Sequence, residues 1–357
     1  MIPVKTVGRY ELLDPIGHGG MAVVYLARQT DLDRQVALKE LRILQSPDDP
    51  ALAERFLREA RMAGSMSHPN IVTVHEYFKH EGTPYIAMEY LQRGSLRPHV
   101  GRMTVAQIAG VLEGVLAALD HAEKCRIVHR DLKPENLLFR TPEDNADLLI
   151  ADFGLSRIMD DEKFHVLTTT CGTPGYMAPE IFNKTGHGKA VDIWAMGVIT
   201  YFLLCGYTPF DRDSDLAEMQ AILRADFSFP PEYWRGVSEE AKDFIRKCLT
   251  VKPGARPTAH EALQHPFVAG IPGAAAGGDA AAGAREGQGQ NLLPTVKKNF
   301  NARRTLHAAI DTVRAINKLR EGGHANMNSP RSPAGPADVS RNAALNLPGS
   351  AAAARNN

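Results

Sequence analysis

The N-terminal part of the chain carries apolar runs separated by a polar, glycine-rich break, a pattern that predicts short strands joined by loops. Two apolar runs flank residues 17–20, and a β-rich stretch then ends at Lys39. This order predicts strand, loop, strand, strand. Residues 55–60 (RFLREA) belong to a segment with a helical pattern. Farther on, residues 193–205 form the strongest apolar stretch, which is too short to span a bilayer.

The C-terminal part divides into three segments by composition. Residues 269–294 are mostly Ala and Gly and predict a flexible linker. Residues 295–321 are basic and, on a helix, place Leu306, Ile310 and Leu319 on one broad face. This pattern is typical of a helix docked on the protein body, of a calmodulin target or of a membrane-surface helix, and the lack of Trp anchors argues against the membrane. Residues 322–357 are rich in Asn, Ala, Pro and Ser, a composition that predicts a disordered tail.

Composition narrows the class of protein. Lys plus Arg and Asp plus Glu both number 41, so no global field recruits nucleic acid or a membrane, and 44% hydrophobic residues can build a full-sized core. The four cysteines are widely spaced without a CxxC motif, which favours reduced thiols. The first ten residues lack the apolar core of a signal peptide. These features predict a cytoplasmic protein.

Two polar motifs in the middle of the chain indicate phosphoryl transfer. Residues 129–136 read HRDLKPEN, and Asp152 follows Asn136 by sixteen residues in the sequence DFG. Asp131 can accept the proton of an attacking hydroxyl, and Lys133 can lie against the transferring phosphate. Asn136 and Asp152 supply the oxygen ligands that Mg²⁺ prefers. The alternative interpretation is that these are ordinary polar loop residues beside a buried Phe. The occurrence of both motifs in this order disfavours it.

The glycine-rich stretch supplies a candidate phosphate-binding loop. It comprises Gly17, His18, Gly19 and Gly20. A glycine lets backbone N–H groups approach phosphate oxygens that a Cβ would hold away. Lys39 follows at the expected distance, and Glu59 is the candidate carboxylate that holds its ammonium. If the segment around Glu59 is considered alone, the alternative is that Glu59 lies on the exposed face of a helix and has no functional role.

Together these motifs resemble a Ser/Thr protein kinase over residues 10–268, with further signatures at 178–180 (APE), 192–197 and Arg256, which is placed to pair with Glu180. The resemblance implies an α+β, bilobal fold with an N-terminal extension at 1–9, an antiparallel-sheet N-lobe at 10–89 and a helical C-lobe at 90–268. It also implies that ATP and Mg²⁺ bind between the lobes. The residues expected around the adenine are the gatekeeper Met88, the hinge residues Glu89 and Leu91, and the apolar Val24, Ala37 and Leu138.

Two further segments indicate which group of protein kinases the chain resembles. Residues 297–304 (KKNFNARR) are similar to the autoinhibitory and calmodulin-binding segment of calcium/calmodulin-dependent kinases, and residues 152–210 resemble a fungal type I member. Residues 1 to about 125 instead resemble the N-lobe of bacterial receptor-type Ser/Thr kinases. This difference predicts a chimera, and one divergent natural kinase is the alternative.

The resemblance also implies regulation and partners. Calcium-calmodulin would bind the basic helix through Leu306, Ile310 and Leu319, and an upstream kinase would phosphorylate Thr169, whose phosphate could pair with Arg130. The predicted function is a Ser/Thr kinase acting on proteins and autoinhibited by residues 295–321. The alternatives are a constitutively active kinase whose tail is only a protein or membrane tether, and a catalytically weak calmodulin-binding scaffold.

Overall fold

The computed structural model describes residues 5–18, 22–42, 61, 64–141, 143, 146–153, 174–183 and 188–270. Several predictions concern residues outside these ranges. They are the roles of Gly19, Gly20, Glu59, Thr169, Leu306, Ile310 and Leu319, most of the linker, and the C-terminal segments.

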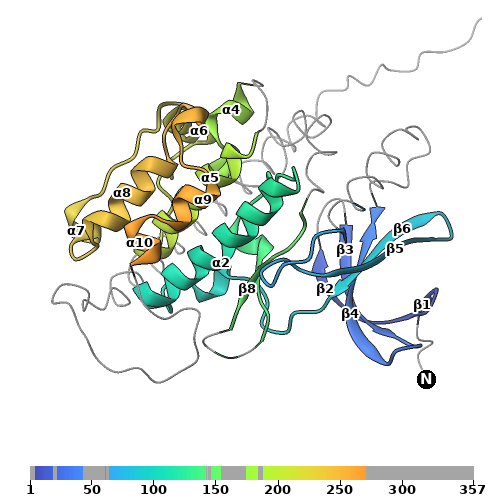
Figure 1. Ribbon diagram of the computed structural model, residues 1–357. Helices are drawn as coiled ribbons and strands as arrows, with labels where there is room; N and C mark the ends of the chain where they lie inside the picture. The colour runs from blue at the N-terminus through green and yellow to red at the C-terminus, as the bar shows by residue number, and fades with distance from the viewer. Residues whose placement is uncertain are drawn as a thin grey trace, which may run out of the picture. The chain divides into compact units, whose positions relative to one another are not determined.

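Six strands form one antiparallel sheet in the N-terminal part (Figure 1). They are β1 (Thr6–Val7), β2 (Tyr10–His18), β3 (Ala22–Gln29), β4 (Arg34–Leu41), β5 (Val74–His80) and β6 (Thr83–Glu89), in the order β1-β2-β3-β4-β6-β5. The predicted order of strand, loop, strand, strand is confirmed by β2, β3 and β4. Glu81 and Gly82 join β5 to β6 with positive φ angles of 49° and 80°. Two such residues suit a tight hairpin whose twist matches that of the strands.

One face of the sheet is held by packed aromatic rings. Phe78 of β5 stacks on Tyr10 of β2 with ring centroids 5.3 Å apart and on Tyr85 of β6 at 5.5 Å. Tyr10 and Tyr85 are buried, and they pack with the alternate inward residues Val36 and Leu38 of β4. Side chains two residues apart point to the same face of a strand, so this layer follows directly from the sequence pattern.

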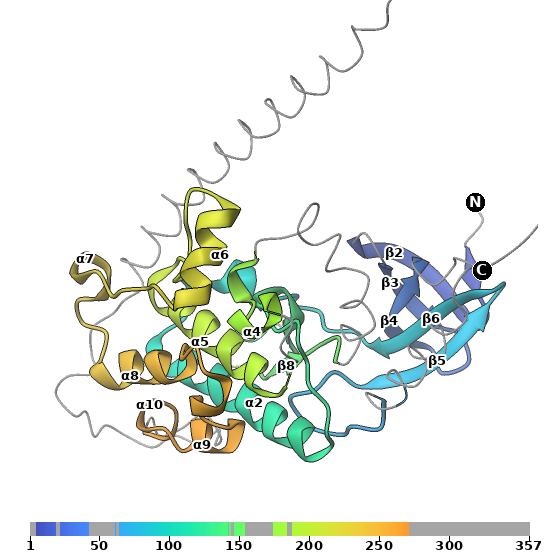
Figure 2. The ribbon, with the colours of Figure 1, turned by 90° about the horizontal axis from the view of Figure 1, so that it is seen from above.

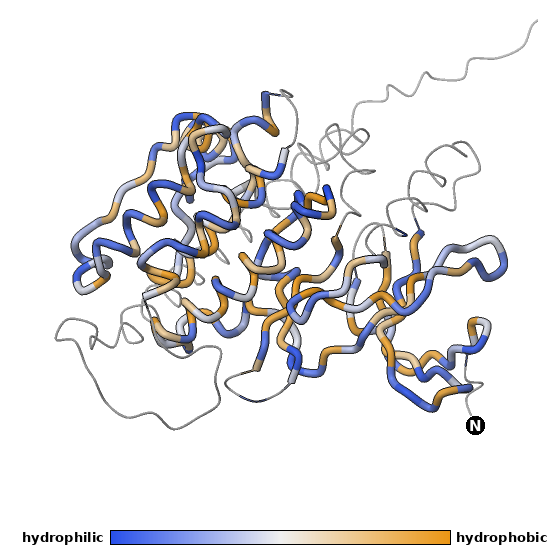
Figure 3. Tube along the Cα trace, viewed as in Figure 1, coloured by the Kyte–Doolittle hydropathy of each residue, from blue (hydrophilic) through white to orange (hydrophobic). Residues whose placement is uncertain are grey.

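Helices make up most of the C-terminal part, together with a short hairpin of β7 (Leu137–Phe139) and β8 (Leu148–Ile150). They are α2 (Val105–Lys124), α4 (Pro179–Phe182), α5 (Ala190–Cys205), α6 (Asp215–Arg224), α7 (Pro231–Trp234), α8 (Glu239–Cys248), α9 (Ala259–Leu263) and α10 (Pro266–Ala269). Hydrophilic and hydrophobic residues interleave along most of these helices, as expected for elements with one buried face (Figure 3). The sheet and the helical part confirm the expected α+β, bilobal fold.

Helix α2 begins with a capping box between Thr104 and Gln107, which satisfies two backbone N–H groups at the helix start. By length and composition alone it is the one helix in the described part of the chain that could cross a membrane. Its apolar residues, including Leu112 and Leu116, are instead buried in the core of the helical part. The helix therefore has the character of a core helix.

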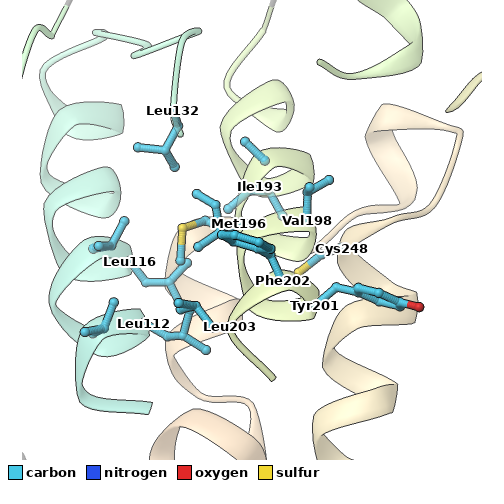
Figure 4. Close-up of a cluster of buried hydrophobic side chains, with 14 of the residues drawn as sticks. Leu112, Leu116, Leu132, Ile193, Met196, Val198, Tyr201, Phe202, Leu203 and Cys248 are labelled. Carbon is cyan, nitrogen blue, oxygen red and sulfur yellow. The ribbon is translucent and has the colours of Figure 1, made fainter. Parts of the chain in front are cut away.

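Helix α5 lies at the centre of the helical part and packs against both α2 and α8 (Figure 2). Every residue from Val191 to Cys205 is buried, so the helix is enclosed on all sides. Figure 4 shows Met196 and Leu203 of α5 among the side chains that fill the space toward Leu112 and Leu116 of α2. This core fixes the helix that supports the site described below.

Gly197 sets the distance between α5 and α8. A Cβ placed on it would lie 2.7 Å from the Cβ of Cys248 and 2.9 Å from Cδ2 of Leu249. We expect Gly197→Ala to destabilise the protein by about 1–3 kcal/mol, because overpacking costs more than the gain in helix propensity. Thermal melting of the variant, with Gly254→Ala as a control that meets nothing within 4 Å, measures the effect. Equal melting temperatures for the two variants would contradict this reading of the helix contact.

Candidate active site

The segment of residues 131–136 folds back on Asp131. Nζ of Lys133 lies 2.8 Å from Oδ2 of Asp131. The Asn136 amide nitrogen donates to the backbone carbonyl of Asp131 at 2.7 Å and to Oδ2 of the same residue at 3.2 Å. Asp131 stays exposed, so its carboxylate is oriented by two neighbours and remains open to solvent. The structure thus brings together three of the predicted site residues.

A buried carboxylate from α5 holds the start of this segment. Asp192 accepts the backbone N–H of His129 through Oδ2 at 2.8 Å and that of Arg130 through Oδ1 at 2.7 Å. Arg130 has a φ of 69°, a conformation that costs a non-glycine residue about 1–3 kcal/mol and persists only when its surroundings impose it. Burial raises the pKa of Asp192, and the nearby His129 and the two N–H donors act against that rise.

The sequence marked residues 192–197 as a signature of the resemblance but assigned Asp192 no role. An acidic residue within an otherwise apolar helical run is the signal that could have identified it, because such an acid needs partners.

His129 connects the Asp131 segment to the strand end that carries Asp152. Its Nε2 lies 2.8 Å from the carbonyl oxygen of Ala151, and its ring packs edge-on against Phe153 with centroids 4.9 Å apart. Asp152 itself has a φ of 61°. Two strained residues, Arg130 and Asp152, therefore lie at one site, held by a fully buried histidine.

Lys39 of β4 forms an ion pair with Asp152, with Nζ 2.8 Å from Oδ1. Both side chains are mostly buried, with exposed fractions of 13% and 33%. Burial of the Asp152 carboxylate opposes its ionisation, but the charge and hydrogen bond of Lys39, together with the charges of His129 and Lys133, outweigh this, and the pKa of Asp152 lies below its usual value. The sequence predicted Glu59 as the partner of Lys39. Glu59 lies outside the described residues, so this pairing stays a prediction; in the described part of the chain Lys39 pairs with Asp152.

The apolar residues expected around an adenine share one cluster. Ala37, Met88 and Leu91 are buried in it, and Val24 and Leu138 pack against it while only partly buried. These residues come from β3, β4, β6, the segment after β6 and β7. Apolar side chains that keep some exposure can offer a surface to a planar ring.

Glu89 ends β6, and its carboxylate is already bound. Arg140 donates to Oε1 at 2.6 Å and to the carbonyl of Pro69 at 2.8 Å. The backbone N–H of Glu89 bonds to the carbonyl of Thr73 at 2.9 Å. The carboxylate and the backbone N–H of Glu89 are thus both engaged within the protein.

Gly17 and His18 end β2, opposite the start of β3. Gly17 pairs with Val24, and a Cβ on Gly17 would come no closer than 3.6 Å to that residue, an ordinary contact. Packing among the described residues therefore does not require glycine here, and the predicted approach to phosphate remains the reason for it. His18 is exposed.

A family model for the protein kinase domain matches residues 10–268. The chain is 60% identical over 263 residues to the calcium/calmodulin-dependent protein kinase cmkB of Emericella nidulans, which covers 72% of this chain and 63% of that protein. It is 45% identical over 260 residues to the calcium/calmodulin-dependent protein kinase type I of Schizosaccharomyces pombe, covering 72% and 73%. The type 1B enzyme of Rattus norvegicus is 40% identical over 264 residues, covering 73% and 75%. The match thus spans less than two thirds of the first of these relatives.

These comparisons give no support to a chimera with a bacterial N-lobe. The alignment to the Emericella nidulans kinase alone covers 263 residues, about the length of the complete domain match at 10–268. One divergent kinase accounts for this similarity without a second parent. The predicted resemblance to a fungal calcium/calmodulin-dependent kinase is confirmed.

Proposed function

Because the chain belongs to the protein kinase family, we propose that it transfers the γ-phosphoryl group of ATP to Ser and Thr hydroxyls of proteins. The observation that carries this proposal is the ion pair between Lys39 and Asp152, which joins the sheet to the strand end that His129 links to the Asp131 segment. A cation for phosphate, a metal-binding acid and a proton acceptor thereby belong to one site.

Asp131, Lys133 and Asp192 have different roles at the substrate hydroxyl. Oδ2 of Asp131 is engaged by Lys133 and Asn136, which leaves Oδ1 to accept the hydroxyl proton. Lys133 offsets the charge of Asp131 and can turn toward a phosphate oxygen, because its side chain is 36% exposed. Asp192 fixes the backbone below them, so the acid is held in place before the substrate arrives.

The donor set fits Mg²⁺ and ATP. The Asn136 amide nitrogen is engaged with Asp131, so its amide oxygen and the Asp152 carboxylate are the hard ligands available to a cation. No cluster of three or more His, Cys, Asp or Glu suited to a metal occurs in the described part of the chain, and two protein ligands are typical where phosphates supply the rest. When bound, ATP supplies the phosphoryl group and Mg²⁺ neutralises its oxygens. Lys39 would bind phosphate, and the cluster around Ala37 would receive the base.

We further propose that residues 295–321 inhibit the enzyme and that calcium-calmodulin relieves this inhibition. Two observations support it: the relatives are named calcium/calmodulin-dependent kinases, and the sequence of this segment is basic, with Leu306, Ile310 and Leu319 spaced to share one face if it forms a helix. We also propose that an upstream kinase phosphorylates Thr169 and that the phosphate pairs with Arg130.

A truncation experiment tests both parts of the proposal. We expect a chain ending at Pro294 to phosphorylate Ser and Thr peptides with Mg-ATP at a rate independent of calcium-calmodulin. The full-length chain should be at least roughly tenfold slower without calcium and reach the same plateau with it, since tenfold corresponds to about 1.4 kcal/mol of closed-state stability. Leu306→Asp should abolish the calmodulin response, whereas Leu345→Asp, outside residues 295–321, should retain it.

The alternatives give different results in the same experiment. Equal rates for the truncated and full-length chains without calcium would favour a constitutive kinase whose tail is a tether. Calmodulin binding by a chain that phosphorylates no peptide would favour the scaffold.

A further inference from the structure

An exposed ion pair lies next to the catalytic segment. Nη1 of Arg97 is 3.0 Å from Oε1 of Glu135, and the two side chains are 51% and 41% exposed. Glu135 follows Asp131 by four residues, within the 3-10 helix Pro134–Asn136. Arg97 begins another 3-10 helix, Arg97–His99, which precedes α2. The pair therefore belongs to the same surface as the proposed proton acceptor.

Arg97 is held in place by more than Glu135. Its guanidinium lies over the ring of Phe202 of α5, with Cζ 5.9 Å from the centroid. The phenol of Tyr176 interacts electrostatically with both charges. Burial raises the pKa of Tyr176, Arg97 opposes this rise, and Glu135 adds to it. An aromatic face and a carboxylate together restrict a long side chain that would otherwise move freely in solvent.

Distance limits place the pair within reach of a bound peptide. A Ser or Thr hydroxyl must come within about 3 Å of the Asp131 carboxylate to lose its proton. Four residues of chain separate the Cα atoms of Asp131 and Glu135 by at most about 14 Å. An extended peptide advances about 3.3 Å per residue, so a side chain two to four residues from the hydroxyl can reach Glu135.

Resting on the proposed function, we propose that Arg97 is a specificity-determining residue that neutralises Glu135 and makes this subsite unfavourable for basic substrate side chains. An incoming guanidinium must displace Arg97 from the carboxylate or lie beside a second cation, and both cost free energy. Neutral side chains do not meet this barrier, and an acidic side chain can share the exposed N–H donors of Arg97. The substrates are therefore Ser or Thr peptides with a neutral or acidic side chain at this subsite.

The test measures kcat/KM of the full-length chain with calcium-calmodulin on a set of Ser peptides. Each peptide places Arg, Leu or Glu at one position between five residues before and three residues after the Ser. We expect Arg97→Leu to raise kcat/KM for Arg at one position by roughly threefold to tenfold and to leave the Leu peptide unchanged. Arg102→Leu removes the same charge from an exposed residue nearby. It should leave kcat/KM unchanged for both the Arg and the Leu peptides.

Two further variants establish that the effect passes through Glu135. Glu135→Gln should raise the use of the Glu peptide at the same position, because Arg97 then lacks its partner. Arg97→Leu should give no gain for Arg peptides in the Glu135→Gln background. If Arg97→Leu fails to fold, as judged by its melting temperature, the Glu135→Gln result carries the test.

The outcomes separate this inference from the proposed function. Failure of the parent chain to phosphorylate any peptide would refute the kinase assignment and the inference with it. A parent chain that phosphorylates the Leu peptide, but already prefers Arg through Glu135 and responds equally with and without Arg97, would refute the inference alone.

Discussion

Replacing Asp131 by Asn is expected to lower kcat for peptide phosphorylation by about 10²- to 10⁴-fold, while ATP affinity changes by less than about threefold. An amide keeps the size of the side chain and its contacts with Lys133 and Asn136 partly intact, but it cannot accept a proton. The loss should therefore fall on turnover. Steady-state kinetics and nucleotide-binding titration of the variant measure the two quantities separately.

The control for this prediction is Asp33→Asn. Asp33 lies in the turn between β3 and β4, is 81% exposed in its side chain and has a φ of 47°, which Asn tolerates. It should leave kcat and ATP affinity unchanged. A turnover of Asp131→Asn within tenfold of the parent chain would assign proton acceptance to another group.

Replacing Arg256 by Met is expected to cost about 3–5 kcal/mol of stability, because it leaves a buried carboxylate without its partner. Arg256 is 6% exposed, and its guanidinium uses all five N–H groups. Nη1 and Nη2 bind Glu180 at 2.6 and 2.8 Å, and the remaining donors reach the carbonyls of Thr250, Ala190 and Val251. The predicted pair between Glu180 and Arg256 is thus present, within a network that removal of either side chain disrupts.

Thermal melting checks this expectation. For a domain of this size the loss corresponds to a fall in melting temperature of roughly 6–20 °C. The matched control is Arg28→Met, which removes an arginine from an exposed pair with Glu11 at 2.7 Å and should shift the melting temperature by no more than about 2 °C. A double replacement, Arg256→Met with Glu180→Leu, should recover part of the loss since no charge remains buried. Equal melting temperatures for Arg256→Met and Arg28→Met would contradict a structural role for the buried pair.

The catalytic segment could be predicted from the sequence because its geometry is local. Lys133 and Asn136 reach Asp131 within two and five residues, so the spacing of the motif almost dictates the contacts. The apolar residues Val24, Ala37 and Leu138 were also predictable, through the register of motifs that surround them. The strands β2, β3 and β4 follow from the apolar runs and the break between them.

Contacts between distant segments were decided only by tertiary structure. Strand register and helix packing bring Lys39 to Asp152, and α5 brings Asp192 to the backbone of His129. Arg97 and Glu135 are 38 residues apart in the sequence, and only the folded chain shows that they form an ion pair. A charged side chain on a sequence can pair with many partners at similar energy, and the packed core selects one by fixing which backbone segments lie within a few ångströms of each other. The chemistry of this protein is thus readable from its motifs, whereas the electrostatic setting of each group depends on the fold.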